Sequence, residues 1–282
     1  ATVHFYVATS DLHREHVLGK TRQETTDMCT AAVAAIKSEA VKMPESRFFL
    51  EFSPEEFTDT DLDFSIAICD HVIEQWQPAD DEKVILNLPA TVERRPPTHY
   101  ADMIEVFIRR LKSDQATISL HAHNDMGCAV ASTQLAVQAG ANRVEGTLFG
   151  QGERSGNVDL ITLILNLQYL GVDTGIDFSD LVNITETISK LTNMTPHERH
   201  PYVGSLVFSA FSGSHQDAIH KCKIWSVHKF PKTTYFIFKP HLSYFGHFAD
   251  LQLCALLYLR SKLPYFYVFA FPRPCTLPTI KP

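Results

Sequence analysis

Within the first 170 residues, short runs rich in β-branched and aromatic residues alternate five times with longer amphipathic runs. The short runs predict strands and the longer runs predict helices. Strands joined by helices through short turns are typical of parallel α/β architecture. We expect part of a closed barrel, which needs eight such units, or a doubly wound sheet, and periodicity alone does not separate them. The predicted strands cover residues 3–7, 47–53, 84–90, 117–123 and 143–149.

The helix after the first strand carries a clear start signal. Thr21 is followed three residues later by Glu24, which is a capping-box signature. We expect Met28, Ala32 and Ile36, spaced four apart, to form the inner face of this helix. Further helices are predicted over residues 62–76, 100–111, 128–139, 158–169 and 181–191.

In parallel α/β folds, catalytic and binding side chains gather at the carboxyl ends of the strands. Side chains capable of such roles lie at or just after the carboxyl ends of the predicted strands, and we expect them to lie close together. They are Glu51 and Ser53, Asn87 and Thr91, His121 and His123, and the stretch from Gly150 to Asn157.

His121 and His123 are two positions apart in a strand, so their side chains point to the same face. Two imidazoles on one face form half of a divalent-metal site, and a pair of structural histidines is the equally weighted alternative. Asn157, one strand–helix step later, is placed to add a neutral oxygen. The Asn124-Asp125 pair offers acceptors that would fix the tautomer of a ligating imidazole.

Glu51 lies among apolar residues at the end of a hydrophobic strand. Its carboxylate is either paired with a buried cation or raised in pKa and available for acid–base work, and an ordinary strand-end acid is the alternative. His215, in a small-residue turn near Asp217, is by itself more typical of a surface histidine. His197 and His200 have an i, i+3 spacing, but their Pro-bounded segment favours structural hydrogen bonds over metal binding.

The Gly150-Gln151-Gly152 stretch lacks both the Walker lysine and the GxGxxG spacing, so it is a weak signal for a nucleotide loop. Its glycines are better explained as positions where the backbone approaches a ligand closely.

The formal net charge of -7 and the pI near 6.0 argue against nucleic acid or an anionic membrane as the main partner. No apolar run reaches the roughly 18–20 residues of a membrane span. The six cysteines have no CxxC spacing and are few for a disulfide scaffold, so we expect a reducing compartment.

Residues 222–282 differ in composition from the rest of the chain. They hold 8 Lys+Arg against 1 Asp+Glu and 14 of the 30 aromatic residues, whereas residues 1–221 hold 17 Lys+Arg against 31 Asp+Glu. We interpret this aromatic and Pro-rich tail as sequence not shaped for this fold. Residues 173–221 are interpreted as a connector that leaves a catalytic domain over residues 1–172.

Six stretches together resemble the 2-isopropylmalate synthases, of the longer fungal and actinobacterial type, within the Claisen-condensing TIM-barrel superfamily. The stretches are VHFYVATSDLHREHVLGKT, FLEFSPEEFTDTD, NLPATVERRPPTHYADMIE, SLHAHNDMGCAVA, EGTLFGQGERSGNVDL and HERHPYVGSLVFSAFSGSHQDAI. The resemblance covers about residues 1–221. It implies an α/β fold, a partial TIM (β/α)8 barrel with about five of its eight units.

The resemblance implies condensation of acetyl-CoA with 3-methyl-2-oxobutanoate, the first step of leucine biosynthesis, with the help of a divalent metal cation (Zn, Mg or Mn). It implies metal ligands at His121, His123 and Asn157. His4 and Thr91 match positions that contact the oxo acid.

The resemblance further implies acid–base work by Glu51 and His215. Gly150, Gly152 and Glu153 match the loop on the acetyl-CoA side. For the full-length protein it implies a homodimer, located in the cytoplasm or, if the source is a fungus, in the mitochondrial matrix.

Two departures from the family pattern bear on activity. The Arg-Asp-Gly segment whose Asp completes the metal site is absent because the chain starts too late, and the resemblance stops after Lys221. We therefore expect an incomplete piece that is inactive alone and poorly soluble. Two alternatives stay open: a homocitrate or citramalate synthase-like enzyme, and a truncated, non-catalytic partner of a full-length synthase.

Overall fold

The structure is a computed structural model that describes residues 1–207, 209 and 212–217. It divides after Leu163 into two compact units, which are described one at a time. The predicted tail over residues 222–282 lies outside the described residues, and the predicted domain bounds at 172 and 221 stay predictions. Within the described part of the chain, no helix is both long enough and apolar enough to cross a membrane.

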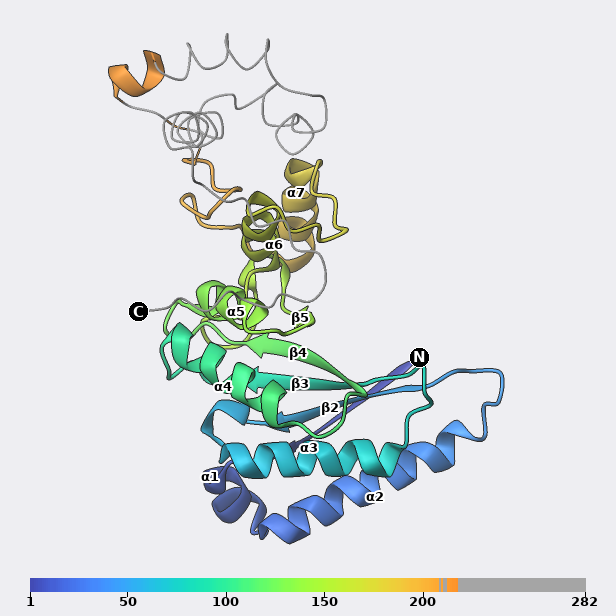
Figure 1. Ribbon diagram of the computed structural model, residues 1–282. Helices are drawn as coiled ribbons and strands as arrows, with labels where there is room; N and C mark the ends of the chain where they lie inside the picture. Colours follow the sequence, from blue (N-terminus) through green and yellow to red (C-terminus); the bar gives the residue numbers. More distant parts are fainter. Residues whose placement is uncertain (208, 210–211, 218–282) are drawn as a thin grey trace, which may run out of the picture. The chain divides into compact units, whose positions relative to one another are not determined.

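The first unit is organised around one parallel sheet of five strands in the order β1-β2-β3-β4-β5 (Figure 1). Each new strand is therefore added on the same side of the previous one, as in a barrel wall. A doubly wound sheet needs a point where the strand order reverses, and this sheet has none. The partial-barrel prediction is confirmed and the doubly wound alternative is wrong. The strands are β1 (Thr2–Ala8), β2 (Phe49–Glu55), β3 (Val84–Ala90), β4 (Ala116–Ala122) and β5 (Arg143–Glu145).

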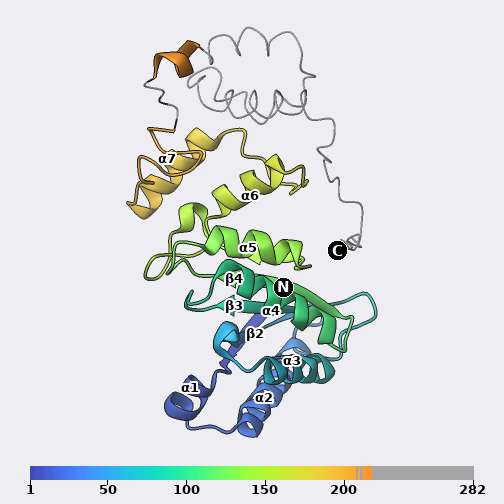
Figure 2. The ribbon, with the colours of Figure 1, turned by 60° about the vertical axis from the view of Figure 1, so that its left-hand side comes forward.

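Helices follow each strand and pack side by side along the sheet. Neighbouring pairs are in contact from α2 to α5, and α2, α3 and α5 contact β1, β2 and β4 (Figure 2). The bounds are α1 (Asp11–His13), the π-helix η1 (Arg14–Leu18), α2 (Arg22–Ala40), the 3-10 turn η2 (Phe57–Asp59), α3 (Leu62–Trp76), α4 (Pro97–Arg110), α5 (Ala129–Gln138), the 3-10 turn η3 (Leu148–Gly150), α6 (Leu160–Tyr169) and α7 (Leu181–Thr192).

The two faces of the sheet differ in chemistry because successive strand residues point to opposite sides. The face under the helices is apolar: Leu50, Phe52, Leu86, Leu88 and Leu120 are fully buried there. The opposite face carries polar side chains from all five strands, and we call it the polar face. Its members are His4, Glu51, Ser53, Asn87, Ser119, His121, Arg143 and Glu145.

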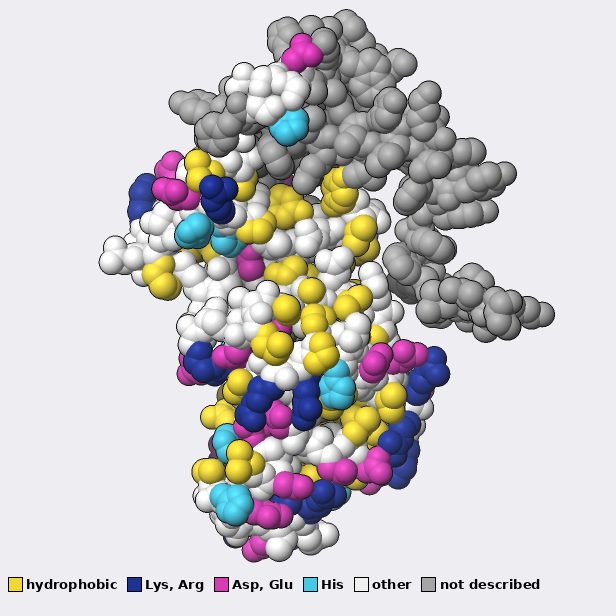
Figure 3. Space-filling view, turned by 90° about the vertical axis from the view of Figure 1, so that its left-hand side faces the viewer, with side chains coloured by type: hydrophobic (Ala, Val, Ile, Leu, Met, Phe, Trp, Pro, Cys, Tyr) yellow, Lys and Arg dark blue, Asp and Glu magenta, His cyan; other side chains and the backbone are white. Residues whose placement is uncertain are grey.

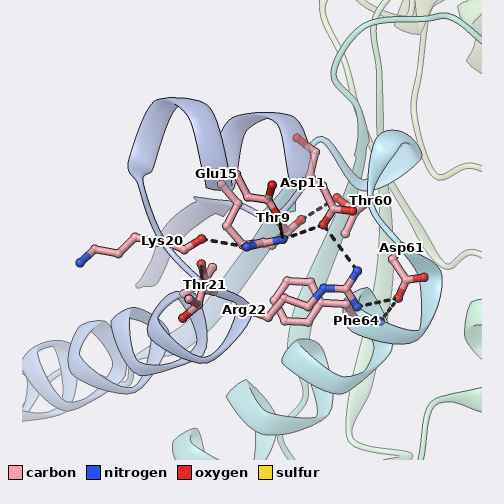
Figure 4. A network of polar contacts seen from close by, with 12 residues as sticks. Thr9, Asp11, Glu15, Lys20, Thr21, Arg22, Thr60, Asp61 and Phe64 are labelled. Carbon is pink, nitrogen blue, oxygen red and sulfur yellow. Dashed lines mark hydrogen bonds and ion pairs between the residues drawn. The ribbon is translucent and has the colours of Figure 1, made fainter.

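The turn from β1 to α2 is held by a polar network (Figure 4). Arg14 is buried, and its guanidinium donates to Asp11 at 2.7 Å, to Glu15 at 3.0 Å and to the carbonyl of Lys20 at 2.8 Å. Thr21 then starts α2 with both hydrogen bonds of a capping box, as its sequence predicts.

The inner face of α2 differs from the prediction. Thr25, Cys29 and Val33 are buried, whereas Met28 is 37% exposed and Ile36 is half-buried. Small and apolar residues surround much of this helix, so more than one stripe fits a helical period. Packing against α3 and β1 selects the stripe.

The fifth predicted strand, over residues 143–149, is too long by four residues. β5 ends at Glu145, and Thr147 instead bonds to Val158 and pairs with Asp159. The backbone leaves the sheet at Gly146, where a β-carbon would collide with Val158. The chain therefore turns toward the loop that carries Asn157.

The outer surface of the first unit carries both signs of charge. On the face in Figure 3, Lys and Arg side chains are interspersed with Asp and Glu over its lower part. Pairs such as Arg110–Asp63 (2.6 Å) and Arg109–Glu105 (2.5 Å) are solvated, so each contributes at most about 1 kcal/mol.

The second unit contains most of α6 and all of α7. Gln168 on α6 donates to Thr174 at 2.8 Å and to the carbonyl of Ile176 at 2.7 Å, which closes the turn after the helix. Tyr202 donates to Asn166 at 2.6 Å and so ties the segment after α7 back to α6.

Candidate metal and acid–base site

Three predicted metal ligands meet at the carboxyl end of β4. The amide Nδ2 of Asn157 lies 3.2 Å from Nε2 of His121 and 3.5 Å from Nε2 of His123. The two imidazole rings lie 5.4 Å apart between centroids. Because an Asn amide presents nitrogen or oxygen after a half-turn, both histidines and the Asn157 oxygen can face one point. Two imidazoles and a neutral oxygen are a ligand set that fits a divalent transition-metal ion.

Backbone bonding fixes the loop that carries Asn157. His123 and Asn157 form an antiparallel bridge, and Asn157 donates to the carbonyl of Gly150 at 3.0 Å. A β-carbon at Gly152 would collide with the Asn157 amide oxygen. Asn157 can therefore occupy this position only because residue 152 is a glycine.

Glu145 orients the His121 ring. Its Oε2 lies 3.1 Å from Nδ1 of His121 and accepts from Asn87 at 2.9 Å, while its Oε1 accepts from Arg143 at 2.6 Å. The hydrogen bond to His121 is the first of the causes that lower the pKa of Glu145 to about 2, so this group is an anion.

The expectation that Asn124 and Asp125 orient an imidazole is wrong. Asn124 accepts from the amide of Ala129 at 3.1 Å and so caps α5. Asp125 accepts two bonds from Arg154, at 2.7 and 3.0 Å, which lower its pKa to about 2. These two side chains therefore bind the start of α5 and the loop of Arg154 instead of an imidazole.

Glu51 combines both environments that its sequence allows. It is 4% exposed, its Oε1 lies 3.5 Å from Nη1 of Arg143, and burial together with the neighbouring Glu145 raises its pKa to about 7. A carboxyl group with a pKa near neutrality exchanges a proton readily at physiological pH. The environment therefore agrees with the acid–base role expected for Glu51.

The two residues predicted to contact the oxo acid have different surroundings. His4 lies on the polar face, with Nε2 2.8 Å from Ser53 Oγ and Nδ1 3.8 Å from Glu51, and burial lowers its pKa. Thr91 donates to Glu55 at 2.8 Å and accepts from the amide of Glu56 at 3.0 Å. Both roles stay predictions.

The sequence model of the HMGL-like family matches residues 1–188. The chain belongs to the HMGL-like family. It is 52% identical over 222 residues to the 2-isopropylmalate synthase of Acetoanaerobium sticklandii, covering 78% of this chain and 39% of that protein. It is 50% identical over 222 residues to the 2-isopropylmalate synthase of Paraburkholderia phytofirmans, with the same two shares. The chain thus spans about two fifths of the length of these relatives.

Solved structures agree on the HMGL-like fold. An HMG-CoA lyase from Acinetobacter baumannii, in complex with coenzyme A and 3-methylmalate, has a TM-score of 0.56 at 16% identity, covering 75% of this chain and 68% of that one. The HMG-CoA lyase of Bacillus subtilis has a TM-score of 0.54 at 18% identity, covering 70% and 65%. At these identities the likeness concerns the fold alone.

An open hollow of about 580 Å³ lies directly beside the three candidate ligands of this HMGL-like chain. Glu145 and Glu153 also line it. The Glu153 side chain is 84% exposed and reaches Arg154 at 3.8 Å. The assignment of Gly150, Gly152 and Glu153 to the acetyl-CoA side stays a prediction.

The remaining histidines lie in the second unit. His215 is exposed in a helical turn, and its acid–base role stays a prediction. His197 accepts from the amide of Arg199 at 3.1 Å, and His200 lies 2.9 Å from the carbonyl of Pro201, which agrees with structural roles. In the described ranges, no group of three or more His, Cys, Asp or Glu side chains forms a metal cluster, so the site depends on the amide of Asn157.

Sequence reasoning missed Arg143 and Glu145, the two charged residues of β5. The i, i+2 spacing of Arg-Val-Glu was a signal that both point to one face. Their partners depend on strand register, in which Ser119 aligns with Arg143 and His121 with Glu145. A single sequence does not specify that register.

Proposed function

We propose that this chain carries the metal and oxo-acid part of a 2-isopropylmalate synthase active site, which joins acetyl-CoA to 3-methyl-2-oxobutanoate. The observation that carries the proposal is the convergence of His121, His123 and Asn157 beside the hollow at the end of β4. The identity of about 50% to proteins of that name supports the choice of substrates.

His121, His123 and Asn157 would hold the divalent ion, which when bound supplies a Lewis acid for the keto group. Two imidazole ligands favour Zn²⁺ over Mg²⁺. Glu51, with its pKa near 7, would exchange a proton at the reacting atoms, and the acid–base role of His215 stays a separate prediction. In the proposed reaction a base would take a proton from the acetyl methyl, and the resulting carbon would bond to the keto carbon. The keto C=O π bond would break and its oxygen would take up a proton, and water would then cleave the thioester to a carboxylate and free coenzyme A.

His4 and Thr91 would contact the oxo acid. Burial lowers the pKa of His4 and so favours its neutral imidazole, and because Nε2 is bonded to Ser53, Nδ1 is the ring nitrogen left for the substrate. Acetyl-CoA would enter beside the loop of Gly150, Gly152 and Glu153.

The proposal is tested by ligand binding to the purified chain. We expect saturable uptake of one Zn²⁺ per chain by calorimetry, lost in the H121A/H123A variant. With zinc present, 3-methyl-2-oxobutanoate should bind more tightly than 2-oxoglutarate. Preference for 2-oxoglutarate would favour a homocitrate synthase, and zinc uptake that survives the double substitution would sink the proposed site.

Turnover is a separate question, measured as coenzyme A released from acetyl-CoA on addition of the oxo acid. We expect none from this chain alone, because the three candidate ligands in the described residues, His121, His123 and Asn157, include no carboxylate. Release of coenzyme A that depends on His121 would overturn this expectation and strengthen the assignment of the reaction.

A further inference from the structure

Both oxygens of the Glu145 carboxylate are engaged by the polar face. Oε1 accepts from Arg143 at 2.6 Å, and Oε2 accepts from Asn87 at 2.9 Å. The same Oε2 lies 3.1 Å from Nδ1 of His121. Partners on β3 and β5 therefore hold the carboxylate in place against a ring on β4. Such a carboxylate presents a fixed acceptor to the imidazole.

An acceptor at this place determines which ring nitrogen carries the proton. A neutral imidazole has one N–H donor and one lone-pair acceptor, and an ionised carboxylate only accepts. The proton of His121 must then sit on Nδ1, and Nε2 keeps its lone pair. That Nε2 is the atom 3.2 Å from the Asn157 amide, at the point where the three candidate ligands meet.

We propose that Glu145 is a positioning residue that holds the His121 proton on Nδ1 and leaves the Nε2 lone pair aimed into the candidate metal site. The consequence for metal affinity rests on the proposed function, whereas the tautomer itself does not. Removing an outer carboxylate of this kind weakens metal binding by about 10–100-fold.

His123 provides an internal control for this effect. Within the described residues its buried Nδ1 has no hydrogen-bond partner. Its backbone amide instead bonds to the carbonyl of Ala90 at 3.1 Å, and its backbone pairs with Asn157. The backbone thus positions His123, and a carboxylate positions His121. A change at Glu145 should alter the tautomer of His121 and leave that of His123 unchanged.

The tautomers can be measured on the metal-free chain by ¹⁵N imidazole spectroscopy with labelled histidine. The chain has 14 histidines, and the signals of His121 and His123 are assigned by their loss in H121Q and H123Q. In the wild-type chain we expect the His121 proton on Nδ1. E145A should release it to a mixture of tautomers, while E145Q, which retains an acceptor oxygen, should keep it. E39A, on the exposed surface of α2, is the matched control.

Several results would overturn the proposal. A wild-type spectrum that shows the His121 proton on Nε2 would overturn it by itself, whether or not E145A folds. An unchanged tautomer in E145A, or an equal change at His123, also does so. Zinc titration of the same variants should show the 10–100-fold loss in E145A and a smaller loss in E145Q. If the wild-type chain takes up no zinc, the proposed function fails and the tautomer assignment stands on its own spectra.

Discussion

Glu51 on β2 and Arg143 on β5 are 92 positions apart and approach to 3.5 Å, although β3 and β4 lie between their strands. Three strand spacings of about 4.8 Å would separate the two backbones by roughly 14 Å. Arg143 spans this gap across β4, where its Nη1 also donates to Ser119 at 2.9 Å. Long-range contact across the polar face brings a raised-pKa carboxyl and a guanidinium together beside the candidate metal site.

The raised pKa of Glu51 predicts a pH-dependent stability difference between the wild-type chain and E51Q. The folded chain holds the Glu51 proton up to about pH 7, whereas the unfolded chain releases it near 4.5. The stabilising contribution of protonated Glu51 is therefore complete below pH 4.5 and is lost as the pH rises to about 7. His4, Arg143 and Glu145 are the ionisable groups that face Glu51.

We expect the free energy of unfolding of E51Q to exceed that of the wild-type chain by about 2–3 kcal/mol at pH 8 and to match it at pH 4.5. Urea unfolding of both proteins across this range measures the difference. A difference that is constant from pH 4.5 to 8 would show that the pKa of Glu51 is not raised in the folded chain.

Gly152→Ala should weaken the candidate metal site more than the fold. The added β-carbon would collide with the Asn157 amide and push it away from His121 and His123. We expect zinc affinity to fall by about tenfold or more, with about 1–2 kcal/mol lost in stability. Calorimetry and urea unfolding give the two numbers. Gly213→Ala is the control, because a β-carbon there meets nothing within 4 Å.

The features that the sequence predicted correctly are those that depend on the local pattern of residues. The strand at 84–90 is found with the predicted bounds, and the i, i+2 spacing of His121 and His123 places both rings together. The inner face of α2 was missed because several stripes satisfy one helical period. Glu145 was missed because its contact with His121 follows from the β4–β5 register, which arises only when the sheet forms.

Arg14→Met should destabilise the first unit, since the buried guanidinium donates to two carboxylates and the Lys20 carbonyl in the turn before α2 (Figure 4). We expect a loss of about 1–3 kcal/mol in urea unfolding. Arg22→Met is the matched control: its ion pairs with Asp11 (3.5 Å) and Asp61 (3.3 Å) are solvated, so its loss should stay below about 1 kcal/mol. Equal losses in the two variants would contradict a special role for Arg14.

Glu93→Ala should destabilise the start of α5. The Glu93 carboxylate is buried and accepts from the backbone amides of Met126 at 2.6 Å and Cys128 at 3.2 Å, just before that helix begins. Its charge also interacts favourably with the positive end of the helix dipole. Removal leaves two amides without their acceptor, and we expect a loss of about 2–3 kcal/mol in the free energy of unfolding.

Two further variants separate the hydrogen bonds of Glu93 from its charge. Glu93→Gln keeps an acceptor oxygen and should lose only about 1 kcal/mol, while Glu105→Ala, a solvated acid on α4, should change stability by less than about 0.5 kcal/mol. Hydrogen exchange of the Met126 and Cys128 amides supplies a local readout, because loss of their acceptor should speed exchange at these two positions first. If Glu93→Ala leaves both exchange rates unchanged, the carboxylate does not hold the start of α5.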